Sequence, residues 1–502
     1  MTSHDTAQPS VVLTNERRWL VTVGLLLGIF LAALEATVVS TAMPTVVANF
    51  GGLDRYSWVF SAYLLTSTAS VPLWGRLSDL YGRRRLYLTA IGLFLVGSML
   101  AGVSQSMLQL VLFRALQGLG AGGLIPLALT IIGEIYTLTE RTRMQAVFSS
   151  VWGVASIAGP LVGGFITDTI SWRWVFYLNL PIGVVAAVVV HRTLSERAHR
   201  RTATVDWQGG VLLFLSITLV LVALSETSPA WAATALASIA ALAYVERAAA
   251  DPILPLALFR NRTVTMATGV GFLAGMALFG TIAFVPLLIQ VTTGGSATSA
   301  GQILTPLYLM WVLASIVAAR LLLRVGARAS TIAGTAAVFV STTALPWLAV
   351  GSSRAAVFAD VGLMGTGLGL AMLSLLLAVQ HSVLRTELGA ATSLNLFARS
   401  IGGAVGVAIM GAVLSAGLGG SLQLTPAALE GTGLRGLTPE LRQGLIVSLQ
   451  HAFASGAIAA GLALVAAFFV PPFAGAAARD VSEPRSGAEA TTLQPEAEPM
   501  GD

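Results

Sequence analysis

Only three ionisable side chains lie well inside the long apolar segments of this sequence, and they are the first candidates for chemistry. Glu35, Arg114 and Arg399 each lie in a run long enough to cross a bilayer as a helix. Charge is costly at that depth, so each must have a partner or a function. A buried carboxyl group beside a guanidinium can lose and regain a proton, which predicts a proton-coupling site.

Glu35 and Arg114 are predicted to lie at the same depth. At about 1.5 Å per residue, Glu35 on an outward-running helix is about 24 Å from the inner end, and Arg114 on an inward-running helix is about 9 Å from the outer surface. Both positions fall in the outer third of the membrane, so the two groups can pair or compete for a proton. The alternative is a fixed ion pair that only specifies packing. For Arg399 the alternative is a contact with a backbone carbonyl or a polar cavity wall.

The composition is that of an integral membrane protein. Of 502 residues, 55% are hydrophobic and 10% charged, with a mean hydropathy of +0.81, whereas soluble chains carry about 25% charged residues. Cysteine is absent and the five histidines are scattered, so we expect no disulfide, no metal site and no cofactor. The net charge of +5 is spread over many short loops, so nucleic acid is not an expected partner.

Apolar segments of about 20 residues follow one another with short polar joints. We predict fourteen transmembrane helices, at 19–41, 57–76, 86–104, 108–131, 142–166, 174–191, 207–225, 230–246, 263–289, 301–322, 330–350, 355–379, 390–415 and 446–470. With the N-terminus inside, 21 of the 28 arginines fall in inner loops and tails, five in outer loops and two within spans. This bias follows the positive-inside rule and predicts a multi-pass protein of the cell membrane with both termini in the cytoplasm.

The predicted helices divide into two groups of six with a pair between them. The expected parts are a cytoplasmic N-terminal tail at 1–18, an N-terminal six-helix bundle at 19–191, an inserted two-helix hairpin with its linkers at 192–262, a C-terminal six-helix bundle at 263–471 and a disordered cytoplasmic tail at 472–502. Polar and small residues dominate the tails, which disfavours a packed core there. The long outer connection at 417–444 contains a segment of mixed polarity at 434–441, which is either a short helix or a loose loop.

A shift of 244 residues lays one charged turn onto another. The aligned residues are Arg76, Gly82 and Arg84 with Arg320, Gly326 and Arg328. The second copy is degenerate, because Leu323 stands where the first has Asp79. Duplicated six-helix halves are a known transporter plan, in which one half rocks against the other to expose a central site to each side in turn.

Five motifs occur in order along the first half of the chain. They are L-E-A-T-V-V with A-M-P at 34–44, G-R-L-S-D-L-Y-G-R-R at 75–84, R-A-L-Q-G at 114–118, G-P-L-V-G-G at 159–164, and W-R-W-V-F with N-L-P at 172–181. Together they resemble the signatures of the major facilitator superfamily, and of its fourteen-helix drug:proton antiporter branch in particular. The resemblance implies an all-α integral membrane fold with two six-helix halves and two inserted helices. One departure is Glu35, where the branch usually has aspartate.

The resemblance also assigns roles to motif residues. Asp79 would be a latch that holds the cytoplasmic gate shut; the alternative is an ordinary loop acid. The other residues of this gate would be Gly75, Gly82, Arg83 and Arg84. The small and bending residues of an antiporter helix would be Gly159, Pro160, Gly163 and Gly164. Their spacing alone is also typical of ordinary helix packing.

Polar and aromatic residues in several spans are candidates for the wall of a central cavity. They are Gln117, Gln290, Asn395, Arg399, Tyr63, Trp152, Tyr308 and Trp311. The amides are the stronger candidates, because buried amides need hydrogen-bond partners, whereas the aromatic residues more often face lipid or the protein core.

These features predict a monomeric, proton-coupled antiporter that exports amphipathic or cationic small molecules by alternating access. Its expected partners are that substrate, protons and the lipid bilayer. A dedicated exporter of a lipid, a metabolite or a self-made antibiotic is an open alternative, and a passive channel is another. An enzyme is not expected, because the sequence assembles no paired carboxylates, activated nucleophile or metal cluster, and it has no phosphate-binding loop for ATP.

Overall fold

Every secondary-structure element in the described part of the chain is helical. The computed structural model describes residues 15–136, 138–194, 207–226, 228–249, 256–384, 387–418 and 438–472. Most of both predicted tails lies outside these residues, as does the 419–437 part of the long connection, which includes the first half of the possible short helix at 434–441. Within the described residues, twelve helical stretches are long and apolar enough to cross a membrane.

Three sets of helices follow one another along the chain. The N-terminal group contains α1 (Asn15–Phe50), η1 (Leu53–Arg55), α2 (Tyr56–Tyr81), α3 (Arg83–Val103), α4 (Met107–Ile135), α5 (Leu138–Thr169), α6 (Trp174–Tyr177) and α7 (Asn179–Thr193). The middle pair is α8 (Trp207–Glu226) and α9 (Pro229–Ala248). The C-terminal group contains η2 (Leu256–Arg260), α10 (Arg262–Thr293), α11 (Ala297–Gly351), α12 (Arg354–His381), α13 (Leu388–Leu418) and α15 (Pro439–Ala467).

Each of the fourteen predicted segments coincides with a helical stretch to within a few residues, but two of them do not qualify as spans by hydropathy and length. Serine and threonine are frequent in α2, which lowers its hydropathy. In α8 the side chains are described without interruption only over Gln208–Leu224, which is shorter than a full span. The transmembrane position of these two helices therefore stays a prediction.

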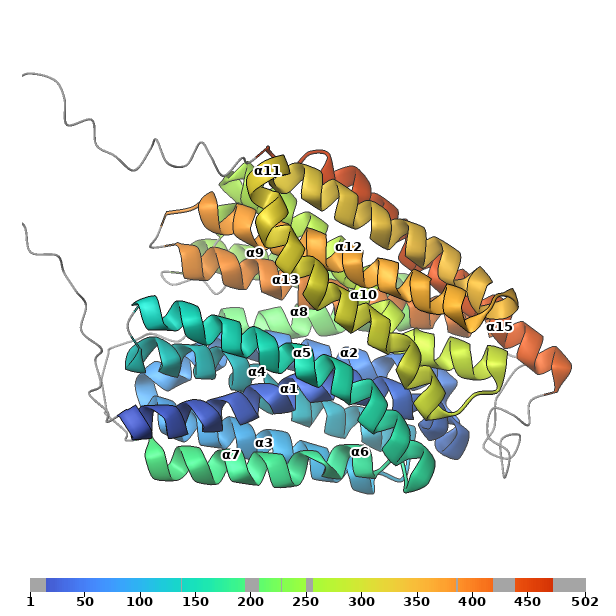
Figure 1. Ribbon diagram of the computed structural model, residues 1–502, viewed down its shortest axis with the longest axis horizontal. Coiled ribbons are helices and arrows are strands. Elements are labelled where there is room, and N and C mark those ends of the chain that lie inside the picture. Colours follow the sequence, from blue (N-terminus) through green and yellow to red (C-terminus); the bar gives the residue numbers. More distant parts are fainter. Residues whose placement is uncertain are drawn as a thin grey trace, which may run out of the picture.

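The N-terminal and C-terminal groups lie side by side as two layers, with α8 beside the seam between them (Figure 1). One apolar cluster joins Leu65 of α2, Leu213 and Leu221 of α8, and Ala404 of α13. Because α2 and α13 belong to different groups, α8 packs across both of them. Its partner α9 is peripheral and largely exposed.

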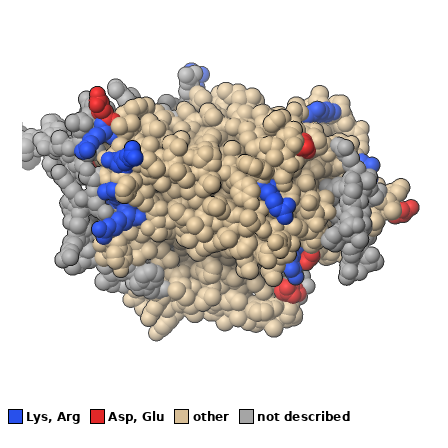
Figure 2. Space-filling view, turned by 90° about the horizontal axis from the view of Figure 1, so that it is seen from below, with Lys and Arg blue, Asp and Glu red and all other residues tan. Residues whose placement is uncertain are grey.

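The two ends of the bundle differ in what they contain. We name them the Arg83 end, where α1 begins and the α2–α3 turn lies, and the Gly294 end, where α10 joins α11. Basic side chains gather at the Arg83 end, on the left of Figure 2, and a broad uncharged band follows. A belt without charge is what the hydrocarbon core of a membrane requires.

The two turns of the predicted repeat share one backbone conformation. Gly82 between α2 and α3 has φ 93° and ψ 142°, and Gly326 inside α11 has φ 82° and ψ 164°. Positive φ at both positions favours glycine. Gly326 thus divides α11 into two helices, as Gly82 divides α2 from α3, and the 244-residue repeat is present in the backbone.

Candidate functional site

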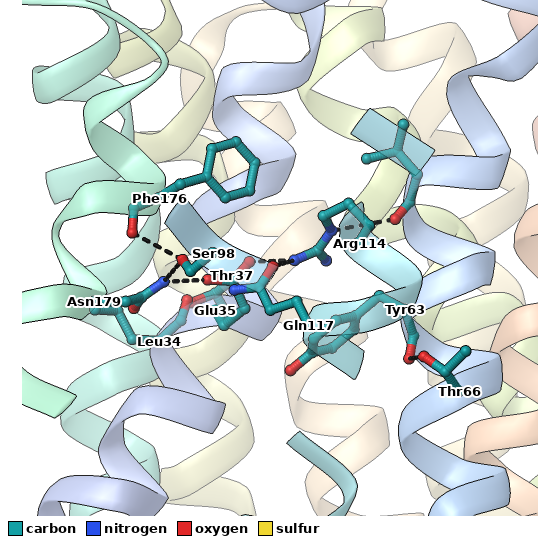
Figure 3. Close-up of polar contacts among 11 residues, drawn as sticks. Leu34, Glu35, Thr37, Tyr63, Thr66, Ser98, Arg114, Gln117, Phe176 and Asn179 are labelled. Atoms are coloured by element: carbon teal, nitrogen blue, oxygen red, sulfur yellow. Dashed lines mark hydrogen bonds and ion pairs between the residues drawn. The ribbon is translucent and has the colours of Figure 1, made fainter. Parts of the chain in front are cut away.

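Helices α1, α4 and α7 bring a carboxylate, a guanidinium and an amide together inside the N-terminal group (Figure 3). Arg114 donates from Nη1 to Glu35 Oε1 in an ion pair, and Asn179 donates from Nδ2 to Glu35 Oε2 at 2.6 Å. The Glu35 side chain is 0% exposed and that of Arg114 is 2% exposed. Both carboxyl oxygens therefore accept hydrogen bonds in a site sealed from solvent, which suits the ionised form of Glu35.

The Arg114 guanidinium is held from three further directions. It donates to Gln117 Oε1 at 2.8 Å and, from Nε, to the Val59 carbonyl at 3.3 Å. Its Cζ lies 4.1 Å from the centroid of the Tyr63 ring, which is a cation–π contact. The predicted meeting of Glu35 and Arg114 is therefore present in the structure, and it includes the predicted cavity residues Gln117 and Tyr63.

Two further members of the site, Asn179 and Ser98, are not among the predicted site residues. Asn179 donates to Ser98 Oγ at 3.0 Å, and Ser98 donates to the Phe176 carbonyl at 2.8 Å. Asn179 belongs to the motif at 172–181, and that is the signal that could have identified it. A single serine in an apolar helix such as α3 carries no comparable signal. This chain of hydrogen bonds fixes the amide that touches Glu35.

The glycines of the G-P-x-x-G-G motif allow α5 to approach two helices at once. A Cβ on Gly159 would lie 2.0 Å from Thr37 Oγ1 of α1, and one on Gly164 would lie 2.6 Å from the Thr298 Cα of α11. Gly301 of α11 in turn lies against the Pro160 carbonyl, 2.1 Å from where its own Cβ would be. In addition, Gly163 packs on α1. The motif therefore joins α5 to its own group and to the C-terminal group.

The predicted gate arginines pair within the N-terminal group. Arg83 forms an ion pair with Glu134 of α4, and Arg84 lies 3.1 Å from Nδ1 of His191 in α7. The backbone of Asp79 is in α2, but its side chain lies outside the described residues. The latch function of Asp79 therefore stays a prediction.

At the Gly294 end, α5 and α11 are joined by a carboxylate. Asp168 accepts hydrogen bonds from the backbone N–H groups of Ala297 at 3.0 Å and Thr298 at 2.8 Å. These N–H groups begin α11 and have no partner inside that helix. Asp168, on the last turn of α5, thus caps a helix of the opposite group, and no sequence motif indicates this contact.

The other hydrogen bonds recorded between the two groups of described helices also lie toward the Gly294 end. Tyr56, the first residue of α2, donates to the Ala283 carbonyl at 2.5 Å, and Ser61 donates to the Ala404 carbonyl at 3.1 Å. Nearer the Arg83 end, a Cβ at Gly75 would meet nothing within 4 Å. The described contacts therefore close the two groups onto each other at the Gly294 end.

The remaining predicted cavity residues do not gather in one place. Asn395 and Arg399 lie on α13 against α10, where Asn395 donates to the Ala267 carbonyl at 3.3 Å. Gln290 and Tyr308 are buried, and Gln290 Nε2 and Tyr308 Oη have no hydrogen-bond partner. Trp152 is 37% exposed, and Trp311 is half-buried.

A fourth ionisable residue in a span corrects the prediction of only three. Asp360 of α12 is 7% exposed, and Ser341 Oγ lies 2.9 Å from both its Oδ2 and its carbonyl oxygen. It falls six residues into the predicted segment at 355–379, close enough to the end to pass for a boundary residue.

Comparisons with known proteins give the family. The profile of the Major Facilitator Superfamily matches residues 25–407. The chain is 36% identical over 455 residues to the multidrug transporter protein MdtP of Bacillus subtilis, covering 87% of this chain and 84% of that protein. It is also 36% identical over 405 residues to multidrug resistance protein 3 of the same organism, covering 78% and 79%. A solved bacterial homologue of the human lysosomal transporter Spinster, in an inward-facing and occupied conformation, shares the fold with a TM-score of 0.68 at 16% identity, over 91% of this chain and 97% of that one. The chain therefore belongs to the major facilitator superfamily, and it is a multi-pass membrane transporter, not an enzyme.

Proposed function

We propose that this transporter is a proton-coupled antiporter that exports amphipathic small molecules from the cytoplasm by alternating access. The observation that carries the proposal is the sealed pair of Glu35 and Arg114, a titratable carboxylate with a guanidinium at its side. Relatives named as a multidrug transporter and a multidrug resistance protein support efflux as the direction of transport. We further propose that the fourteen helical stretches all span the membrane, that the two groups of six are the rocking halves, and that one chain suffices.

Proton coupling would use the partners that Glu35 has in this state. Protonation removes its attraction to Arg114, because only the ionised carboxyl forms the pair. The new O–H needs an acceptor, and Asn179 Oδ1 is a buried atom without a hydrogen-bond partner. A turn of that amide would present Oδ1 to the protonated acid. Loading and release of a proton would therefore rearrange α1, α4 and α7 together.

The closed Gly294 end gives the state its place in the cycle. We infer from the arginine bias that the Arg83 end is cytoplasmic, and we therefore assign the structure to the inward-facing state. In the opposite state the contacts of Asp168, Tyr56 and Ser61 would break, and Asp79 would close the Arg83 end. Inward proton movement supplies about 2.3 kcal/mol per 100 mV of membrane potential, which can drive export against a gradient.

Dye transport in proteoliposomes under an imposed pH gradient tests the proposal. We expect Glu35→Gln to abolish gradient-driven transport, because an amide of the same shape cannot carry a proton. Glu440→Gln is the matched control, because Glu440 is an exposed acid in the first turn of α15. Unchanged gradient-driven transport in Glu35→Gln would place the proton site elsewhere.

Two rival functions give different results in the same vesicles. A passive channel would move dye at the same rate after the proton gradient is collapsed. A dedicated exporter of one lipid, metabolite or antibiotic would be competed by that compound and not by unrelated amphiphiles.

A further inference from the structure

Arg399 carries a charge that no described residue neutralises. It is the twelfth residue of α13, about 17 Å from Leu388 at 1.5 Å per residue, and so lies near the middle of the helix. Its Nε is buried and has no hydrogen-bond partner, and no ion pair joins it among the described residues. The alternative in which its side chain contacts a backbone carbonyl therefore finds no support among the described residues.

Close packing fixes the position of Arg399 between α13 and α10. A Cβ on Gly275 of α10 would lie 2.2 Å from the Arg399 carbonyl oxygen, and one on Gly402 would lie 2.0 Å from the Phe272 carbonyl oxygen. The backbones of the two helices thus touch on both sides of Arg399. The side chain is half-buried, so its guanidinium is held by a rigid support and can still be reached by a ligand.

Neither Glu35 nor Asp360 pairs with Arg399. Glu35 is already bound by Arg114 and Asn179. Asp360 contacts Ser341 and lies seven residues from the start of α12, at the opposite end from the start of α13. An unpaired charge at this depth is strongly unfavourable, and no described residue supplies its counter-charge, which favours an anionic ligand as the source.

We propose that Arg399 binds the negatively charged group of the substrate, a carboxylate, sulfonate or phosphate on an amphipathic organic anion. The Glu35–Arg114 pair is neutral and sealed from solvent, so Arg399 supplies the net positive charge of these three groups. Asn395, one turn before Arg399 on the same face of α13, adds a polar side chain beside it. Binding of the anion does not depend on the proposed export function, whereas transport of the anion rests on it. The proposal replaces the expectation of a cationic substrate.

Paired dyes of opposite charge test the binding site directly. The full chain is placed in nanodiscs of phosphatidylcholine, and binding of fluorescein, an anionic xanthene, and rhodamine 6G, a cationic xanthene, is measured by fluorescence polarisation without a pH gradient. We expect fluorescein to bind more tightly than rhodamine 6G. Arg399→Gln should weaken fluorescein binding about tenfold or more, because a charge-assisted hydrogen bond is lost, and it should leave rhodamine 6G unchanged or tighter.

Two controls separate charge from folding. Arg354→Gln removes an exposed arginine at the start of α12 that donates to Gln302 of α11. It should change the affinity for neither dye. Arg399→Lys keeps the charge and should retain most of the fluorescein affinity. If the glutamine variant does not fold, displacement of fluorescein from the parent protein tests the anion site instead. Naphthalene-1-sulfonate should compete with fluorescein, and 1-naphthylammonium should not.

The proposal would be overturned if Arg399→Gln weakened the binding of both dyes equally or of neither. It would also be overturned if the parent protein bound rhodamine 6G more tightly than fluorescein. Its failure is distinguishable from failure of the proton site, because binding is measured without a gradient. If Glu35→Gln still exports dye while Arg399→Gln loses the anion, the anion site stands and the proton site is wrong. The opposite pattern rejects the anion site alone.

Discussion

Replacing Arg114 by methionine tests whether Glu35 is a charged group sealed in the protein. The substitution removes the ion pair to Glu35, the hydrogen bonds to Gln117 and Val59, and the contact with the Tyr63 ring. Removing one partner of a buried pair costs about 3–5 kcal/mol, and each lost hydrogen bond costs about 1 kcal/mol. We therefore expect the free energy of unfolding to fall by about 5 kcal/mol at neutral pH.

The loss of stability in Arg114→Met should depend on pH, and the direction of that dependence follows from the charge on Glu35. In the variant, the ionised form of Glu35 has lost its cation, while the protonated form is neutral and tolerates burial. The folded variant therefore takes up a proton that the unfolded chain releases, so its stability recovers as pH falls. The parent protein keeps the ion pair, so the difference between the two proteins should narrow from pH 8 to pH 5.

Unfolding by heat or by sodium dodecyl sulfate, followed by tryptophan fluorescence, measures the difference at each pH. Arg354→Met is the matched control, because Arg354 is exposed. The double variant Glu35→Gln with Arg114→Met should recover much of the loss, since it removes both charges. A stability difference that does not change with pH, together with a double variant no better than the single one, would refute the assignment of a sealed ion pair.

Three further predictions concern the packing of the two groups and the repeat. Asp168→Asn should shift the equilibrium between closed and open states about two- to fivefold toward opening at the Gly294 end. A charge at an exposed helix N-terminus is worth about 0.3–1 kcal/mol. Distances between spin labels at introduced cysteines measure the opening, since the chain has no native cysteine. Gly164→Leu should prevent closure at that end, because its Cβ would lie 2.6 Å from the Thr298 Cα, and the same labels should show only the open distance. Gly82→Ala should lower stability by about 1–2 kcal/mol because of its positive φ, while Gly75→Ala, in helical backbone with nothing within 4 Å, should be neutral or slightly stabilising in thermal unfolding.

The parts of the fold that follow from spacing could be predicted from the sequence. Each predicted segment coincides with a helical stretch, because hydrophobic length is a local property. The turn at Gly326 was found because it repeats the charged turn at Gly82, and both glycines have a positive φ. The pairing of Glu35 with Arg114 followed from depth, since a rise of 1.5 Å per residue places both groups in one layer.

The parts that depend on helix rotation and tertiary packing could not be predicted. Depth says nothing about which side of α7 faces α1, so Asn179 was missed although it touches Glu35. The sequence around Asp168 does not mark it as the cap of α11. Helices α5 and α11 belong to different groups and meet only in the folded protein. Arg399 was identified as a charge in a span, but its lack of a partner is a property of the helices around it.

The seam between α5 and α11 has a mechanical consequence. Where Gly164 meets Thr298 and Gly301 meets Pro160, main chain lies directly on main chain. Contacts of this kind can separate and rejoin with few side-chain rotamers to rearrange. Closure at this end should therefore be fast and return to one geometry each time, so that the slow steps of turnover lie in ligand and proton exchange.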